Sequence, residues 1–393
     1  MKFVVITPTY NENENIKKTV EALQKVFKTM PSHEFHILVT DGNSPDGTAN
    51  SVRELIKQDS NLHLLVEKEK RGLGAAYKDA MNFAFETMKA DVVITFDADL
   101  SHDPKVIPSF VKYFEEGENY VCGTRYKKGG GIPKEWGIHR KLLSSLGNLY
   151  VRTIYFGSGL TDFTSGYKAF NKKVYDVIKD KIGSHGGYTF AISSNLECIR
   201  NGFKAVEVPY HFTEREFGKS KMGTEYFFKA FAFVTKARIA DFINSRFGKV
   251  FIGGGAGALS QLIFYGLIFY PLIEVSNIFS LPTNIEVYGF ILHPQFLLSQ
   301  LLGIEVGVAV SFLINNHWAF GDKKLEGLMF FRRYIKNNFV VSGAILIQLF
   351  IGQVLILSFG FGLFRNYLYQ IVGILFGLIW NFYFYKKIIW KVK

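Results

Sequence analysis

The sequence predicts an α/β domain with a mostly parallel sheet, followed by an all-helical transmembrane domain. Residues 1–222 alternate short β-branched runs with helical patterns, which is typical of a parallel sheet covered by helices. Residues 249–393 are apolar and carry only 11 of the 46 lysines and arginines and 5 of the 34 aspartates and glutamates. This composition excludes a disordered chain and a disulfide scaffold. Cys122 and Cys198 lack metal-type spacing, and we expect both to be reduced.

Each element of the α/β domain is indicated by its own pattern. Short apolar runs predict strands at 3–7, 35–40, 62–66, 92–96 and 120–124. Amphipathic patterns predict helices at about 14–29, 73–88 and 104–116. Ligands of such sheets bind at the carboxyl ends of the strands, so the residues that follow each strand are the candidates for function.

Four long apolar stretches predict four membrane spans, at about 251–273, 296–314, 339–363 and 368–385. The loop 274–288 has no lysine or arginine, whereas the loop 321–337 has five and the C-terminus has four. Basic loops stay inside, and the N-terminus lacks the apolar run of a signal peptide. We therefore expect a multi-pass protein of the cell membrane with both termini and the active site in the cytoplasm. The net charge of +12 then reports membrane topology, and we expect no nucleic-acid partner.

The segment 223–249 alternates phenylalanines with basic residues directly before the first span. This pattern favours amphipathic helices in the headgroup layer, and the alternative is a helix that lies against the soluble domain. The expected division is therefore a catalytic domain at 1–222, interfacial helices at 223–249 and a four-helix membrane domain at 250–393. Glu305 lies inside the second span, where a carboxylate is costly, so it serves either helix packing or function.

Polar residues follow three of the predicted strands. Asp97 and Asp99 come directly after the strand at 92–96, and two carboxylates there can bind a divalent cation that also holds a diphosphate. Each aspartate alone is more simply a turn or cap residue, but polar loops after two other strands favour a shared site. Asp41 begins one such loop, either as an Asx-turn residue or as a nucleotide contact. A Walker-type phosphate loop is absent from the sequence.

A second set of residues suits phosphate groups. Arg140 and Ser144 are four residues apart, so one face of a helix would carry both. Arginine forks and a hydroxyl bind phosphates well, although a single arginine is more often part of a solvated basic face. Because these residues lead toward the interfacial segment, they indicate a phosphate headgroup at the membrane surface. The full set is Arg125, Arg140, Ser144, Arg215 and Lys221.

Several sequence words in residues 3–225 together resemble one family. They are PTYNENENI, DGNSPDGT, RGLGAAY, DADLSHDP, GTRY, TDFTSGYKAF and REFGKSKMG, in this order. The set is similar to the glycosyltransferase family 2 enzymes that make dolichyl (polyprenyl) phosphate mannose. The resemblance implies a GT-A fold, a divalent metal (Mg²⁺ or Mn²⁺) and a C-terminal domain like the GtrA-like four-helix proteins.

The resemblance also implies roles for individual residues. Metal ligands would be Asp97, Asp99 and Ser101, where some members have glutamine in place of Ser101. Catalytic residues would be Asp99, Arg125, Arg140 and Arg215. The nucleotide and the two phosphates would be held by Pro8, Tyr10, Glu12, Val39, Asp41, Asp97, Ala98, Asp99, Ser101, Arg125, Ser144, Arg215 and Lys221. Two departures are Gly42, where many members have a second acid, and Gly186, where some have a lysine.

The expected reaction is inverting transfer of mannose from GDP-mannose to a polyprenyl (dolichyl) phosphate in the bilayer. A phosphate monoester has a second pKa of about 6, so at neutral pH it is a nucleophile that needs no general base. One alternative is UDP-glucose as the donor. Another is a translocase of lipid-linked sugars with a transferase-like domain, which the intact Asp97, Asp99 and Arg140 argue against. The sequence does not fix the oligomeric state or the lipid.

Overall fold

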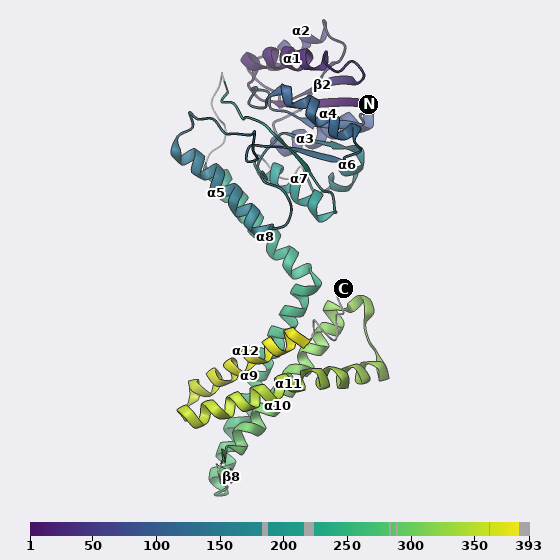
Figure 1. The fold of residues 1–393 in the computed structure, drawn as a ribbon. Coiled ribbons are helices and arrows are strands. Elements are labelled where there is room, and N and C mark those ends of the chain that lie inside the picture. Colours follow the sequence, from purple (N-terminus) through teal and green to yellow (C-terminus); the bar gives the residue numbers. More distant parts are fainter. Residues whose placement is uncertain (183–187, 216–223, 283, 288–289, 361, 385–393) are drawn as a thin grey trace. The chain divides into compact units, whose positions relative to one another are not determined.

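The protein is described from a computed structural model that covers residues 1–182, 188–215, 224–282, 284–287, 290–360 and 362–384. The chain forms two compact units, Met1–Arg238 and Ile239–Lys393 (Figure 1). The expected division at 222 and 249 remains a prediction, because helix α8 (Thr224–Asn244) continues across the boundary between the two units.

The first unit is built on a seven-stranded sheet with the strand order β3-β2-β1-β4-β6-β5-β7. All five predicted strands are confirmed, and the two that the sequence did not predict are β6 and β7. The strands pair in parallel except β6, which lies antiparallel between β4 and β5. Their bounds are β1 Lys2–Thr9, β2 Glu34–Asp41, β3 Leu62–Val66, β4 Val92–Thr95, β5 Tyr120–Thr124, β6 Lys168–Asn171 and β7 Val206–Pro209.

Apolar side chains cover both faces of this sheet, as expected for buried parallel strands. Along β1, Val4 and Ile6 belong to one hydrophobic core, whereas Phe3 and Val5 belong to a second core on the opposite face. Helices α3 and α7 contribute to the first core, and α1 and α4 contribute to the second. The helices of this unit are α1 Asn13–Phe27, α2 Thr48–Ile56, α3 Leu73–Asn82, η1 Phe83–Thr87, η2 Pro104–Val106, α4 Ile107–Glu115, α5 Ile138–Ile154, α6 Lys172–Ile178, α7 Tyr188–Arg200 and α8.

Parallel pairing brings the carboxyl ends of neighbouring strands to one edge of the sheet. Thr9 at the end of β1 pairs with Asp41 at the end of β2, and Asp41 pairs with Val66 at the end of β3. Strand β4 runs alongside β1 and ends two residues before Asp97. The polar residues that follow these strands are therefore gathered at the same edge.

Helix α8 combines both interpretations that the sequence left open. Ala230 and Val234 are buried in the core of the first unit, as in an ordinary packed helix. Phe228 and Phe231 are 70% and 47% exposed, and Phe231 also stacks on Tyr150. The helix therefore lies against the soluble unit on one side and presents aromatic rings on another.

The second unit is helical, with a short hairpin in the loop between its first two helices. Among the described residues, three helical segments are long and apolar enough to cross a membrane: Arg246–Ile278, Pro294–Ala319 and Val341–Phe359. The fourth predicted span overlaps α12 and extends to residue 385, outside the described residues, so it remains a prediction. The elements are α9 Arg246–Ile278, β8 Ile285–Val287, β9 Phe290–Leu292, α10 Pro294–Ile314, η3 Asn315–Ala319, η4 Gly321–Lys323, α11 Gly327–Phe359 and α12 Leu363–Phe384.

One expectation about this unit is corrected. The basic segment 321–337, expected to be a loop, becomes helical at Gly327, so that Arg332, Arg333 and Lys336 lie in the first turns of α11. The apolar part of α11 that is suited to a membrane begins later, at Val341.

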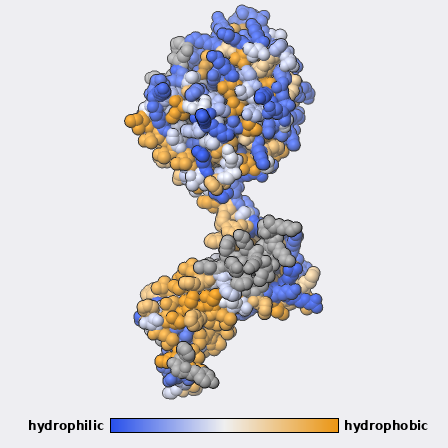
Figure 2. All heavy atoms as spheres, viewed as in Figure 1, coloured by the Kyte–Doolittle hydropathy of each residue, from blue (hydrophilic) through white to orange (hydrophobic). Residues whose placement is uncertain are grey.

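The second unit exposes many apolar side chains and buries several polar ones. Figure 2 shows apolar residues over much of its visible face, and side chains such as Leu267 and Phe350 are more than 60% exposed. Glutamines from four helices are buried in addition to the apolar cluster around Tyr265 and Phe296. Gln261 donates to the side chain of Gln348 at 2.9 Å, and Gln300 donates to the backbone of Gln348 at 2.8 Å. The fourth is Gln370 of α12, whose side-chain oxygen lies 3.5 Å from the amide nitrogen of Gln261. Such a distribution suits a helix bundle surrounded by lipid.

Two further contacts hold α10 against its neighbours α9 and α11. Gly257 of α9 faces Gly307 of α10 so closely that a Cβ on Gly257 would lie 2.5 Å from the Gly307 carbonyl oxygen. Glu305 accepts hydrogen bonds from Tyr334 (2.5 Å) and Asn338 (2.7 Å) of α11. These donors supply the hydrogen bonds that a helix-packing role for Glu305 requires.

Candidate active site

Asp99 is the buried member of the carboxylate pair that follows β4. One of its oxygens accepts a hydrogen bond from the backbone of Ser101 at 3.1 Å, and the other lies 3.0 Å from the guanidinium of Arg215. The side chain of Asp97 is 39% exposed, against 8% for Asp99. Partial loss of hydration raises the pKa of Asp97, and the nearby charge of Asp99 raises it further. The structure thus brings together two carboxylates and one of the predicted phosphate-binding arginines.

His102 contacts both the backbone and the carboxylate of Asp97. It was not among the residues predicted from the sequence. Its Nδ1 accepts the backbone N–H of Asp97 at 3.2 Å, and its Nε2 lies 3.5 Å from the Asp97 carboxylate. The ring stacks on Tyr167 with 4.7 Å between centroids. Burial lowers the pKa of His102, which favours the neutral ring that this pattern of contacts requires. Its position in the word DADLSHDP was the available signal.

The residues around Asp99 fit a divalent cation. Ser101 is 2% exposed, and its hydroxyl has no hydrogen-bond partner among the described residues. Across the same residues, no group of three or more His, Cys, Asp or Glu side chains is placed to hold a metal. Mg²⁺ commonly takes only one or two carboxylates and completes its shell with substrate phosphates and water. Asp97, Asp99 and the hydroxyl of Ser101 suit a cation that binds together with a diphosphate.

Asp41 is fully buried at the end of β2, and its carboxylate is engaged within the protein. One oxygen accepts from the backbone of Ser44 at 2.8 Å. The other accepts from the hydroxyls of Thr9 (2.9 Å) and Ser44 (2.6 Å). These bonds fix the loop after β2, which matches the Asx-turn alternative; a direct contact of Asp41 with the nucleotide remains a prediction.

Two further residues predicted to hold the nucleotide, Tyr10 and Glu12, follow β1. Tyr10 lies beneath Lys70, whose ammonium is 3.6 Å from the ring centre. The Glu12 carbonyl accepts the first hydrogen bonds of α1, and its carboxylate accepts from Asn15 at 2.8 Å. Three other predicted residues would contact a nucleotide mainly through their backbone groups. They are Pro8 within β1, Val39 in the core of β2 and the buried Ala98.

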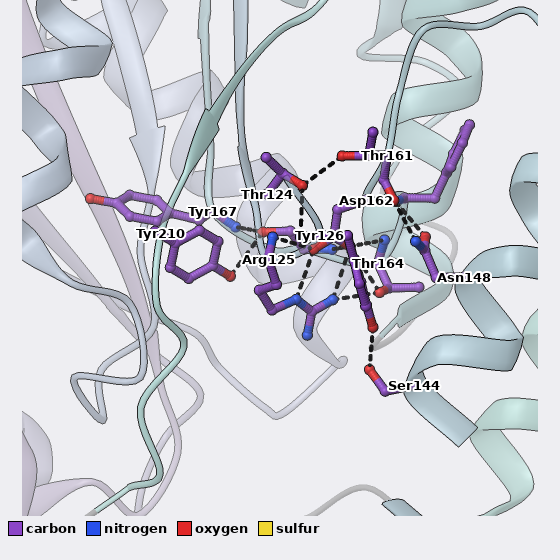
Figure 3. Close-up of polar contacts among 12 residues, drawn as sticks. Thr124, Arg125, Tyr126, Ser144, Asn148, Thr161, Asp162, Thr164, Tyr167 and Tyr210 are labelled. Atoms are coloured by element: carbon purple, nitrogen blue, oxygen red, sulfur yellow. Dashed lines mark hydrogen bonds and ion pairs between the residues drawn. The ribbon is translucent and has the colours of Figure 1, made fainter. Parts of the chain in front are cut away.

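Arg125 has a structural partner that the sequence analysis missed. Its guanidinium donates to both oxygens of Asp162, at 2.7 and 2.9 Å, and to the hydroxyl of Thr164 at 2.6 Å (Figure 3). Both charged side chains are at most 3% exposed. Burial alone would raise the pKa of Asp162, but the charge and hydrogen bonds of Arg125 outweigh burial and lower it. The expected phosphate contact of Arg125 remains a prediction, and the observed geometry directs its donors to Asp162.

This ion pair is the centre of a larger polar network. Glu207 of β7 accepts from the backbone of Thr161 (2.7 Å) and of Asp162 (3.0 Å). Tyr126 and Ser144 share a hydrogen bond of 2.8 Å, which connects the end of β5 to α5 (Figure 3). The predicted phosphate ligand Ser144 is therefore held beside the segment that carries Arg125.

Arg140 occupies a more open position on α5, one turn before Ser144. Its guanidinium donates to Glu214 at 3.0 and 3.1 Å and lies 3.9 Å from the ring centre of Trp136. Trp136 also donates to Glu214. The next residue, Arg215, contacts Asp99, so residues 214 and 215 connect the carboxylate pair to Arg140. Lys221 lies outside the described residues.

Comparison with known proteins identifies the class of protein that this fold and site define. The family described as "Glycosyl transferase family 2" matches residues 4–179, and the family described as "GtrA/DPMS, transmembrane domain" matches residues 250–390. The chain belongs to glycosyltransferase family 2, in the branch that carries a GtrA/DPMS transmembrane domain. Its catalytic unit has the expected GT-A-like fold, and its second unit marks it as a membrane protein.

Two curated relatives are similar to this chain over most of their own length. It is 38% identical over 220 residues to the polyprenol monophosphomannose synthase of Mycolicibacterium smegmatis, covering 56% of this chain and 80% of that protein. It is 35% identical over 222 residues to the undecaprenyl-phosphate mannosyltransferase of Micrococcus luteus, covering 56% and 88%. Among solved structures, a glucosyl-3-phosphoglycerate synthase from Mycobacterium tuberculosis matches 60% of this chain and 79% of its own, at 14% identity and a TM-score of 0.44.

Proposed function

We propose that the protein transfers mannose, with inversion, from GDP-mannose to a polyprenyl phosphate held in the membrane. The observation that carries this proposal is the connection between the Asp97–Asp99 pair and Arg140 through residues 214 and 215. It supports a site for a nucleoside diphosphate beside a site for a second phosphate. The mannosyltransferase names of both relatives favour mannose and a polyprenyl phosphate over other sugars and acceptors.

The donor site is formed by the residues at the end of β4. Asp97, Asp99 and Ser101 would hold Mg²⁺ or Mn²⁺, which when bound neutralises charge on the diphosphate leaving group. Arg215, which contacts Asp99, would contact the same diphosphate. His102 keeps the peptide and carboxylate of Asp97 in position.

The acceptor needs orientation more than activation. Its phosphate is largely dianionic at neutral pH, because its second pKa is about 6. One phosphate oxygen forms a bond to the anomeric carbon of mannose while the bond from that carbon to the diphosphate breaks. Arg140 and Ser144 would hold this phosphate in line, so that catalysis rests on positioning and charge rather than on a general base.

A transfer assay with the full-length protein in bilayers tests the proposal. GDP-mannose and UDP-glucose, each with a radiolabelled sugar, are offered together with a polyprenyl phosphate, with Mg²⁺ or with a chelator. We expect labelled lipid from GDP-mannose only, and none with the chelator. Asp99→Asn should lose transfer, while Asp176→Asn, the same change at a surface aspartate that is 42% exposed, should keep it. If labelled lipid formed from UDP-glucose only, UDP-glucose and not GDP-mannose would be the donor. Transfer in the presence of the chelator would refute the metal site.

A further inference from the structure

We propose that Glu67 accepts hydrogen bonds from the base of the nucleotide donor and makes the site selective for guanine. The inference rests on the proposed function, because it assumes that a nucleoside diphosphate sugar binds at this edge of the sheet. Glu67 was not among the residues that the sequence analysis singled out. It is the first residue after β3, and its backbone N–H donates to the carbonyl of Asp41 at 2.8 Å. Its carboxylate is therefore placed next to the loop that follows β2.

Asp41 is the carboxylate expected to contact the nucleotide, but its oxygens are already bound by Thr9 and Ser44. The carboxylate of Glu67 is differently engaged. Its Oε1 accepts from Arg71 at 3.0 Å, and its Oε2 lies on the side of Gly42. Of these two neighbouring carboxylates at the strand ends, Glu67 keeps more capacity to accept hydrogen bonds from a ligand.

Gly42 lies between an aromatic ring and this carboxylate. A Cβ built on Gly42 would lie 3.5 Å from the ring of Tyr10 and 3.6 Å from Oε2 of Glu67. Without a side chain at residue 42, a planar base can lie on the Gly42 peptide beside Tyr10 with its edge toward Glu67. The departure from the family pattern at Gly42 then has a physical consequence.

The side chain of Glu67 is almost completely buried but borders a cavity. Its side chain is only 4% exposed, and on the side of Arg71 it lines a cavity of about 520 Å³ with Asp79 and Asn82, whereas Gly42 and Tyr10 do not line this cavity. Hydrogen bonds to a carboxylate in such a sheltered place are stronger than the same bonds in open water. Arg71 also pairs with Asp79, so it can remain in place while the carboxylate accepts further bonds.

The chemistry of the base edges decides which nucleotide such a site prefers. Guanine presents two adjacent donors, N1–H and the N2 amine, which match the two oxygens of one carboxylate. Hypoxanthine presents N1–H without the amine. Uracil presents one N–H between two carbonyl oxygens, and those oxygens would face the negative carboxylate. A carboxylate therefore favours guanine over hypoxanthine and disfavours uracil.

Nucleotide binding to the full-length protein in lipid nanodiscs, measured by calorimetry with Mg²⁺, tests the inference. The probes are GDP, IDP and UDP, and the variants are Glu67→Gln and the control Glu54→Gln, which removes a charge from a glutamate that is 68% exposed on α2. We expect the wild type and the control to bind GDP more tightly than IDP and much more tightly than UDP. Glu67→Gln should weaken GDP binding by about 10- to 100-fold, because charge-assisted bonds are lost, and should leave UDP binding unchanged or tighter, because the uracil oxygens no longer face a negative charge.

A purely structural role for Glu67, holding Arg71 and its loop, predicts a different result. In that case Glu67→Gln would weaken GDP and UDP by the same factor, and Arg71→Ala would reproduce its effect. Either outcome, or an unchanged GDP-to-UDP ratio, overturns the inference. The measurement needs neither sugar transfer nor acceptor. A protein that fails to transfer mannose but shows the expected change in ratio would therefore refute the proposed function alone.

Discussion

Replacing Asp162 with asparagine removes the charge that balances a buried arginine. The carboxylate accepts from the backbone, Nε and Nη2 of Arg125, and also from the backbone of Thr164 and of Ser165 at 3.1 Å each. Asparagine has one acceptor oxygen instead of two and no charge. In Asp162→Asn, the guanidinium of Arg125 therefore stays buried without a counter-ion, and at least one of its bonds is lost.

The size of the effect follows from this burial. Breaking a buried ion pair by removing one partner typically costs about 3–5 kcal/mol, since the remaining charge is left uncompensated. For a domain of 150–250 residues, each kcal/mol lowers the melting temperature by about 2–4 °C. We therefore expect the first unit of Asp162→Asn to melt roughly 6–20 °C below the wild type.

Thermal unfolding of the full chain in detergent, followed by near-UV circular dichroism, measures this difference. The control is Asp176→Asn, whose carboxylate pairs with Lys172 and Lys179 on the surface. Exposed pairs contribute at most about 1 kcal/mol, so the control should melt within a few degrees of the wild type. If Asp162→Asn melted as the control does, the ion pair would not be the structural element that its geometry indicates.

Four further results are expected. Asp99→Ala should abolish transfer in a protein that melts like the wild type, and full turnover would refute the metal assignment. Arg140→Ala should raise the KM for the lipid phosphate by about 10- to 100-fold and leave GDP binding intact, as measured by acceptor titration. Burial lowers the pKa of Lys168 from 10.5 to about 8. Between these two pH values, the unfolded chain therefore keeps a proton on Lys168 that the folded chain has lost. The stability of the wild type relative to Lys168→Met should thus rise by about 3 kcal/mol from pH 8 to pH 10.5, and a flat difference in unfolding free energy would contradict this. Cysteine at Ser280 should react with an impermeant thiol reagent outside intact cells and cysteine at Lys324 should not, while the opposite pattern would reverse the topology.

The predicted strands were those with continuous apolar runs, because strands buried on both faces carry that pattern in the sequence itself. Strand β6 lacks it. Its four residues include Lys168, which is 1% exposed and donates to Ser194 at 2.9 Å. A lysine in a run of four residues predicts a surface turn, and only the tertiary fold shows that α7 supplies its acceptors. The antiparallel insertion of β6 between β4 and β5 was likewise outside the reach of local patterns.

The candidate site shows the same limit. The aspartates and Ser101 follow one strand, so their proximity could be predicted from sequence order alone. Arg125 and Asp162 are separated by 37 residues, and no spacing rule links them. His102 was within reach, because it stands three residues after Asp99 in a word that had already been recognised, but its contact with Asp97 depends on how the chain turns after β4.

Two arginines that looked alike in the sequence differ in what they can bind. The side chain of Arg125 is 3% exposed and pairs with a carboxylate that is fully buried, so a phosphate would have to displace Asp162 from a buried site. The side chain of Arg140 is 38% exposed, and that of its partner Glu214 is 40% exposed. An exposed pair is worth little, so a dianionic phosphate can displace Glu214 at small cost and bind the same fork more strongly. Exposure, which the sequence does not encode locally, therefore makes Arg140 the better candidate for the acceptor phosphate.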